Sequence, residues 1–289
     1  MMLKTLARTV RQRWRDEPYL RMVAASADAF LVSYPKSGRT WLRYLLSCYF
    51  AESAGLGFEP DLTTTFGVLP NFDRDPVRGV DAFIGRGAKA DLPLVPVSHL
   101  PYRPQLFLDR PVLFLVRDPR DVIVSAYFHA TRHKKSFSGD MDAFLSEQHY
   151  GLHALIAYLN SWAEGLKSHP HHVISYEEML ANPEQVVTGI LTFLGEEPRP
   201  DILARAVTAA QFDRMRDKER DSGIPGHDYD RTDSQSMRMR SGKAGTFGQW
   251  LREDQANLIV ERCRRELSPE ARALIAITHP DFQSFREGR

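Results

Sequence analysis

Four short apolar runs are spread along the first part of the chain. Runs of this length without polar alternation predict strands that are buried on both faces, as in a parallel sheet. They are AFLVSY at 29–34, LPLVPVS at 92–98, PVLFLV at 111–116 and HVISY at 172–176.

Apolar residues at helical spacing separate these runs and follow the last of them. Pro119 suits the start of the helix after the third run, and Gly195 suits the end of a later helix. Strands that alternate with helices predict an α/β fold, here a single domain with a central parallel sheet flanked by helices. The predicted helices cover 40–52, 119–131, 141–166 in two pieces, 183–194, 199–210 and 252–265.

Two long stretches, 53–91 and 217–246, have no firm period and are rich in polar residues and glycine. Long connections of this kind in a compact domain are usually lids, binding loops or disordered segments. The N-terminal residues have the pattern of a basic amphipathic helix, which we interpret as a solvated surface helix. We therefore divide the chain into an N-terminal helical extension, 1–28, and a main domain, 29–289.

The charge balance excludes one broad class of partner. The chain has 38 basic and 37 acidic residues among 289, so no overall basic field favours nucleic acid. Cys48 and Cys263 give neither a disulfide framework nor metal-ligand spacing, which fits a reducing compartment. No apolar stretch approaches the length of a membrane span, and no signal-peptide pattern is present. We expect a cytoplasmic protein.

Residues that can bind an anion or transfer a proton follow every predicted strand. Because ligands of an open parallel sheet bind at the carboxyl ends of its strands, these residues are expected along one rim. They are Lys36, Ser37 and Thr40 after the first strand, His99 after the second, Arg117 after the third and Tyr176 at the end of the fourth.

The segment YPKSGRTW, 34–41, has the pattern of a phosphate-binding loop between a strand and a helix. Gly38 allows the backbone to approach an anion, and the first amides of the helix would point at it. Lys36 adds a positive charge, but it precedes the glycine, whereas the loop of nucleotide hydrolases places lysine after it. The alternative is an ordinary turn.

The segment LFLVRDPRDVIVSAYFHATRH, 113–133, adds a second candidate anion site. Arg117 ends a buried strand, and Ser125 lies eight residues later in the following helix. A guanidinium can hold a phosphate through two hydrogen bonds. The alternative is that Arg117 pairs with Asp118 or Asp121 in a surface ion network.

Together these segments resemble the sulfotransferase family that uses 3′-phosphoadenosine 5′-phosphosulfate (PAPS). YPKSGRTW is similar to its Y-P-K-S-G-T-T-W loop, and RDPRDVIVS to its R-N-P-x-D-x-x-V-S element. Further similarities are SHLPY to a T-H-L-P segment, YEEMLANPEQVVTGILTFLG to a Y-E-D-M…P…I-x-x-F-L-G stretch, and RSGKAGTF to an R-K-G-x-x-G-x-W loop. The matches fall in family order between residue 30 and about residue 255.

The resemblance implies transfer of a sulfuryl group from PAPS to a hydroxyl or amine of a small molecule, with a P-loop-like loop for the phosphosulfate. It implies two catalytic residues. Lys36 would stabilise charge on the leaving oxygen. His99 would be the general base. His129 and His133 are lesser candidates on the acceptor side.

The resemblance also implies how the donor is bound, with no metal required. The 5′-phosphosulfate side of the donor would be bound by Lys36, Ser37, Gly38, Arg39 and Thr40. The 3′-phosphate would be bound by Arg117, Ser125, Arg240, Ser241 and Gly242. The adenine would contact Trp41, Tyr176 and Phe212.

The chain departs from the family pattern at several positions. Arg39 replaces a threonine, so its side chain adds charge or reaches the acceptor. Ser241 replaces a lysine, which weakens one 3′-phosphate contact. An alternative register of the glycine loop uses Lys243 in place of Arg240. The family's C-terminal dimer motif is not visible, so the oligomeric state stays open.

Two other functions compete with sulfotransfer. A nucleotide kinase with an atypical loop needs a carboxylate for Mg²⁺, which Asp118 would supply, but its lysine is misplaced. A catalytically silent nucleotide sensor would not need both Lys36 and His99. The acceptor would contact 53–91, 126–150 and 217–239, whose aromatic residues suit a phenolic, lipid-like or sugar-bearing molecule.

Overall fold

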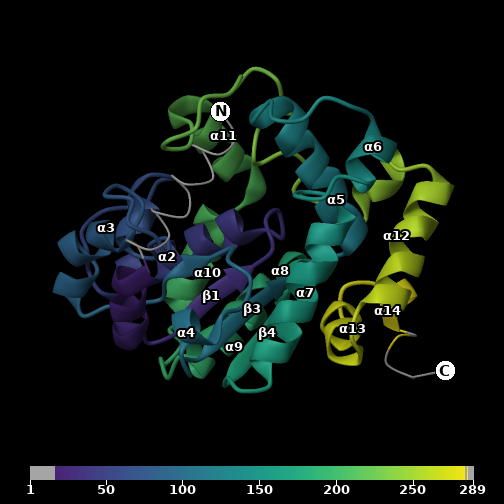
Figure 1. Cartoon of the computed structure of the whole chain (residues 1–289). Coiled ribbons are helices and arrows are strands. Elements are labelled where there is room, and N and C mark those ends of the chain that lie inside the picture. The colour runs from purple at the N-terminus through teal and green to yellow at the C-terminus, as the bar shows by residue number, and fades with distance from the viewer. Residues whose placement is uncertain (1–16, 284, 286–289) are drawn as a thin grey trace.

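A four-stranded parallel sheet forms the centre of the computed structural model, which describes residues 17–283 and 285 (Figure 1). The strands lie in the order β2-β1-β3-β4, and every neighbouring pair is parallel. The predicted α/β fold with a central parallel sheet is therefore confirmed. The strands are β1 (Phe30–Ser33), β2 (Val97–Ser98), β3 (Val112–Val116) and β4 (His171–Ser175).

Strand β2 is much shorter than the predicted run at 92–98. Pro93 and Pro96 have no N–H to donate to a ladder, so only the last two residues pair as a strand. The carbonyls before β2 still accept, since the amide of Leu31 donates to Pro96 at 3.1 Å.

Helices cover both faces of the sheet, and most of the predicted ones are present. The predicted helix 119–131 divides into α5 (Pro119–Phe128) and a π-helical turn (His129–His133). The other helices are α2 (Arg39–Ser53), α3 (Val80–Gly85), α4 (Pro104–Phe107), α6 (Met141–Leu145), α7 (Leu152–Leu166), α8 (Tyr176–Ala181), α9 (Pro183–Phe193), α10 (Pro200–Ala209), α11 (Phe212–Ser222), α12 (Glu253–Glu266), α13 (Pro269–Ile275) and α14 (Pro280–Gln283), and short 3₁₀ turns cover Thr64–Gly67, Ala88–Ala90 and Thr246–Gln249.

Helix α11 corrects the prediction that the chain is irregular from residue 217 onward. The helix continues to Ser222, yet only Met215 and Glu219 are buried along it. A helix with so few apolar positions leaves almost no periodic signal in the sequence.

Successive residues of the strands point to two separate cores. Phe30, Val32 and Phe114 pack with α5, α7, α12 and α13 on one face. Leu31 and Leu113 pack with α2, α9 and α10 on the other. The alternation follows from the two-residue period of a strand, and burial on both faces explains the continuous apolar runs.

The first described residues of the chain pack against the first of these cores. Residues 17–26 are helical, and Val23 and Ala24 are buried against the first face. The rest of the predicted N-terminal helix lies outside the described residues, and the domain division at residue 28 stays a prediction. Within the described part of the chain, no helix combines the length and apolar content needed to cross a membrane.

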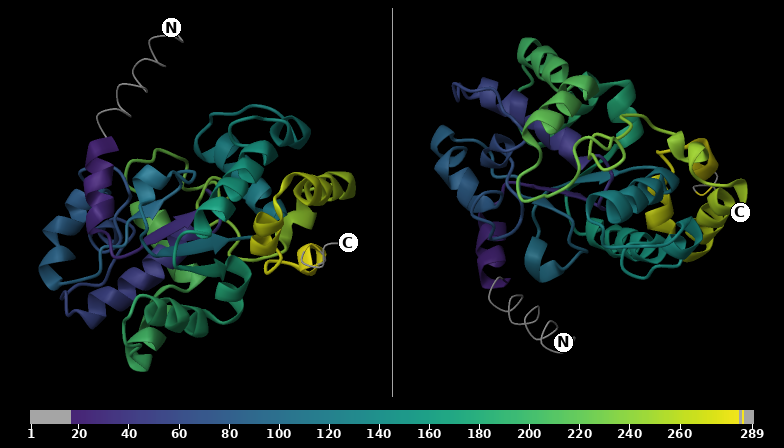
Figure 2. Two further views of the ribbon diagram at one scale, coloured as in Figure 1. Left: turned by 60° about the horizontal axis from the view of Figure 1, so that its bottom comes forward. Right: turned by 90° about the horizontal axis from the view of Figure 1, so that it is seen from above.

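The parallel arrangement places the starts of α2, α5 and α8 at one edge of the sheet, because each follows directly from β1, β3 or β4. In the view from above, residues 223–245 cross over the sheet as a long connection between α11 and α12 (Figure 2). Three strand ends and one long connection therefore surround the same region.

Trp162 on α7 is fully buried and offers a test of this packing. Its ring lies 4.7 Å from that of Phe107, and its indole N–H donates to the carbonyl of Leu100 at 2.9 Å. We expect Trp162→Ala to lower the free energy of unfolding by about 3–5 kcal/mol, because a large cavity opens. Urea denaturation measures the change. Ile84→Ala, at an exposed position on α3, should stay within about 0.5 kcal/mol, and equal losses in both variants would contradict the described core.

Candidate functional site

A cavity of about 590 Å³ lies at the carboxyl ends of the strands. It is lined by all but one of the residues predicted to bind a nucleotide or act on it. The exception is Ser37, which is buried beneath the loop. The lining residues from the prediction are Lys36, Gly38, Arg39, Thr40, Trp41, His99, Arg117, Ser125, Tyr176, Phe212, Arg240, Ser241 and Gly242.

The loop between β1 and α2 presents the first amides of α2 to this cavity. Lys36 and Gly38 both have positive φ, 75° and 101°, so the chain turns sharply there. Gly38 is the N-cap residue of α2, and no side chain of the described residues caps that helix. Uncapped N–H groups at a helix start form a favourable site for an anion.

Gly38 also allows a close approach between the loop and Tyr176. A Cβ at Gly38 would overlap the Tyr176 ring, so no other residue fits without displacing it. Tyr176 also contacts a charged group, since the Arg117 guanidinium lies 4.2 Å from the centroid of its ring. Tyr176 therefore links the loop to the cation that ends β3.

Lys36 is surrounded by other cations. Burial, the largest cause, acts together with Arg238, Arg117 and Arg240 to lower its pKa to about 7, and Glu219 opposes them. An anion bound beside Lys36 would raise this pKa, because it favours the charged ammonium.

His99, directly after β2, has a fixed tautomer. Its Nδ1 lies 2.7 Å from the carbonyl oxygen of Ser33, which can only accept, so Nδ1 carries the proton. Nε2 is therefore the basic nitrogen. Burial holds the pKa of His99 well below its usual value, with Arg39 acting in the same direction. The neutral form, which can accept a proton, prevails at neutral pH.

Arg117 is buried and, besides lying over the Tyr176 ring, has three polar partners. It donates to the carbonyls of Lys36 at 3.3 Å and Lys243 at 3.1 Å, and it pairs with Asp121 at 3.2 Å. The ion pair with Asp121 that we considered as an alternative is thus present, but it is buried and not part of a surface network. Nε of Arg117 is buried without a partner.

Arg240 approaches the same region from the long connection. Its guanidinium lies over the ring of Phe128 at 4.7 Å, and no carboxylate of a described residue pairs with it. Burial and Arg117 lower its pKa. Lys243 is exposed and does not line the cavity, so the geometry favours the register that uses Arg240.

One end of the cavity is apolar and aromatic. The indole N–H of Trp41 donates to the carbonyl of Ala210 at 2.9 Å, and its ring lies edge-on to Tyr176 at 5.8 Å. Phe212 packs against Gly242, where φ is 62° and a Cβ would overlap the ring. These faces suit a flat heterocycle. Leu180, Pro183, Val207 and Met215 complete this end.

Sequence reasoning missed several cavity residues. Arg238 and His227 line it from the long connection, and no motif in that polar segment marked them. His129, a lesser candidate, also lines the cavity, whereas His133 is buried behind it. Burial holds the pKa of His129 well below its usual value, with the charge of Lys36 in the same direction.

In the part of the chain that the structure describes, the cavity lining has many cations but no aspartate or glutamate. Asp118, the carboxylate that a kinase would use, is 1% exposed and pairs with Arg120 at 2.7 Å. It does not line the cavity, and Arg120 already neutralises it. The expectation that no metal takes part stays a prediction.

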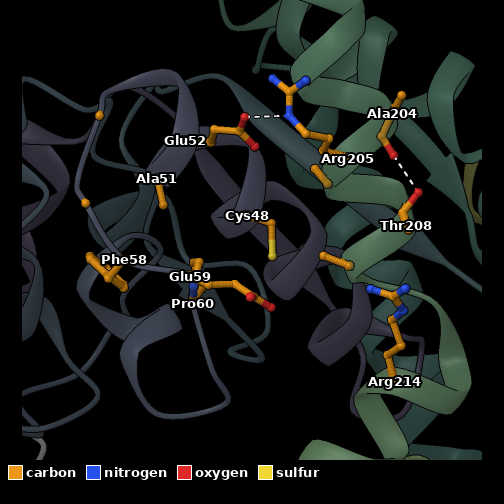
Figure 3. Close-up of a pocket in the computed structure, with 14 residues that line it drawn as sticks. Cys48, Ala51, Glu52, Phe58, Glu59, Pro60, Ala204, Arg205, Thr208 and Arg214 are labelled. Carbon is orange, nitrogen blue, oxygen red and sulfur yellow. Dashed lines mark hydrogen bonds and ion pairs between the residues drawn. The ribbon is translucent and has the colours of Figure 1, made fainter.

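A second cavity, of about 680 Å³, lies between α2 and α10 (Figure 3). None of the predicted site residues lines it. Glu52 on one wall pairs with Arg205 on the other at 2.6 Å (Figure 3). The cavity at the strand ends is therefore the candidate site.

Comparison with known proteins agrees with this geometry. A family model described as "Sulfotransferase domain" matches residues 26–270. The 3-alpha-hydroxysteroid sulfotransferase of Cavia porcellus is 26% identical over 69% of both chains, and sulfotransferase 1A1 of Rattus norvegicus is 26% identical over 81% of both. The crystal structure of mouse sulfotransferase SULT7A1 complexed with PAP superposes with a TM-score of 0.58 and 21% identity, covering 91% of this chain and 89% of that one. The chain belongs to the family of PAPS-dependent sulfotransferases.

Proposed function

We propose that the protein transfers a sulfuryl group from PAPS to a hydroxyl or amine of a small-molecule acceptor at the strand-end cavity. One observation supports this most strongly. The last residue of β1, Ser33, binds His99, and the loop that follows it carries Lys36. A candidate base and a candidate cation for the leaving group are thus anchored to the same strand end.

The residues present fit the donor. Two buried guanidinium nitrogens, Nε of Arg117 and Nε of Arg240, lack partners in the described protein, which suits an added phosphate. Ser125 lines the cavity beside them. The N-terminus of α2 suits the phosphosulfate. Trp41 and Phe212 suit the adenine.

PAPS, when bound, supplies the sulfuryl group and the bond that breaks. Lys36 then neutralises the negative charge that develops on the leaving oxygen, which is where a fixed cation accelerates transfer most. Nε2 of His99 takes the proton of the attacking hydroxyl, since Nδ1 is held by Ser33. The amides of Gly38 and Arg39 hold the 5′ side in place.

The acceptor is proposed to be a small molecule, as the name of the guinea-pig steroid sulfotransferase indicates for that relative. Its hydroxyl would lie beside His99, in the cavity to which the long connection contributes His227 and Arg238. A cytoplasmic location is likewise proposed, because Cys48 and Cys263 are both buried and unpaired.

Binding of adenosine 3′,5′-bisphosphate (PAP) is expected to take up protons near pH 7.5. The pKa of Lys36 in the free protein is about 7, so part of the population is neutral there, and the bound anion raises it. The affinity should fall as pH rises above 7. Calorimetry in buffers of different ionisation enthalpy measures the uptake. Lys36→Met should abolish this contribution, and unchanged uptake in that variant would contradict it.

His99→Gln is expected to lower kcat by about 10²–10⁴-fold, the range for loss of a general base. PAP affinity should stay within about threefold, because His99 does not hold the nucleotide. In the wild type, kcat/KM should fall with acid only below pH 6.5, since the pKa of His99 is lowered. His153→Gln, at an exposed position on α7, is the matched control. An acidic limb that survives in His99→Gln would exclude the residue as the base.

Arg240→Met is expected to weaken PAP binding by about 10–100-fold while leaving AMP within about twofold, because only PAP has a 3′-phosphate. Calorimetric titration in EDTA, with ATP as a third ligand, measures all three. Lys243→Met is the control and should change little, since Lys243 is exposed. Preference of the wild type for ATP over PAP would refute the proposed function in favour of a kinase.

A further inference from the structure

A third, much smaller cavity of about 60 Å³ adjoins the donor cavity. The two share Arg39, Thr40, His227 and Arg238. Among the described residues, the lining of the small cavity also has no aspartate or glutamate, and it includes four arginines. Its remaining lining residues are Arg43, Leu62, Thr65, Phe66, Asn71, Arg78 and Ile224.

Helix α2 supplies two of the arginines, one turn apart. Arg39 is partly buried, and no described residue forms a hydrogen bond or ion pair with its side chain. Arg43 is 5% exposed, donates to Oδ1 of Asn71 at 2.6 Å and lies over the ring of Phe66. Nε of Arg43 is buried without a partner. Neither guanidinium is neutralised by a carboxylate contact.

Arg238 is held by a row of neutral groups. It donates to Nε2 of His227 at 2.8 Å, and His227 in turn donates from Nδ1 to Nε2 of His133 at 3.1 Å. His133 donates from Nδ1 to the carbonyl of Ser236 at 2.7 Å, which fixes the direction of the whole row. The row orients Arg238 without supplying a negative charge. Nε of Arg238 is also buried and unpartnered.

The acidic residues nearby are engaged elsewhere. Asp75 pairs with Arg78 at 2.6 Å, so the fourth arginine is neutralised. Glu219 is fully buried and accepts from the hydroxyl of Tyr229 and from the amides of Arg238 and Met239. The carboxylate of Asp73 accepts from the amide of Asp75. The guanidiniums of Arg39, Arg43 and Arg238 have no ion-pair partner among the described residues.

The size and charge of the small cavity define what it can hold. One water needs about 10–15 Å³ of such space, so the cavity accommodates a few atoms and not a nucleotide. Buried cations without a counter-charge are unfavourable, and an anion removes that cost. In agreement, burial and the neighbouring arginines lower the pKa of Arg39 to about 9 and hold that of Arg43 well below its usual value.

We propose that this small cavity binds an acidic oxygen group of the acceptor, such as a carboxylate, while the acceptor's hydroxyl lies beside His99. The inference rests on the proposed sulfotransfer and narrows its substrate class to hydroxylated acids. Arg39 and Arg238 line both cavities, so one small molecule can span them. The same three arginines act electrostatically on His99, which places them near the base.

The test compares acids with their neutral amides on three scaffolds, using protein saturated with PAP. The pairs are 3-(4-hydroxyphenyl)propionate, glucuronate and 12-hydroxydodecanoate, each beside its amide. On at least one scaffold, calorimetry should show the acid binding about tenfold or more tightly than the amide, since charge-assisted hydrogen bonds are strong. Arg39→Thr and Arg43→Met should each reduce that preference to about twofold, because each removes one of the cations.

Arg103→Met is the matched control, since Arg103 is exposed and lines neither cavity. It should keep the full preference. Arg39→Thr keeps the test decisive if the buried Arg43 is needed for folding, because the side chain of Arg39 forms no hydrogen bond or ion pair with a described residue that the substitution would remove. No preference for the acid on any scaffold overturns the proposal.

A second result would also overturn it. If both variants weaken PAP but keep the ratio of acid to amide, the arginines serve the donor and not the acceptor. Failure of the proposed function is recognised separately, because PAP itself would then not bind. The comparison of acid and amide without PAP would still decide whether the small cavity selects anions.

Discussion

The parallel pairing of four strands is the constraint on which the site depends. Because β1, β2 and β3 run in one direction, Lys36, His99 and Arg117 leave the sheet at the same edge although the sequence separates them widely. The hydrogen bond from His99 to the carbonyl of Ser33 then joins two strand ends directly and selects the basic nitrogen. This one contact therefore depends on the strand order and also determines which nitrogen of His99 can accept a proton.

Electrostatics is the second organising feature. Among the described residues, the cavity lining has several cations and no carboxylate, so like charges lie close together. The pKa of Lys36 is lowered by its burial first and by the neighbouring arginines second. Anionic ligands relieve the repulsion between these charges, and binding is therefore favoured most for molecules that carry several negative charges, as PAPS does. The glycines at 38 and 242 let aromatic rings pack closely on the two loops that surround such a ligand.

Much of this could be predicted from sequence because it follows from local chemistry. Two features of the sequence predicted which residues lie together at the ends of the strands. One is the strand–loop–helix pattern around Gly38, and the other is the set of charged or polar residues that follow the strands. Arg238 could not be found in this way, because its orientation depends on His227 and His133, which come from other parts of the fold. Helix α11 was missed for a related reason. Its stability comes from contacts such as those of Glu219, not from an apolar stripe.

The most direct test of the account is hydrogen exchange of the whole protein with and without PAP. The first amides of α2, residues 38–41, together with the segments around Arg117 and Arg240, should exchange more slowly when PAP is bound. Residues 51–60, which contribute to the lining of the cavity between α2 and α10 and not to that of the donor cavity, should not change. Protection confined to that second cavity, or no protection of the α2 amides, would contradict the assignment of the donor site.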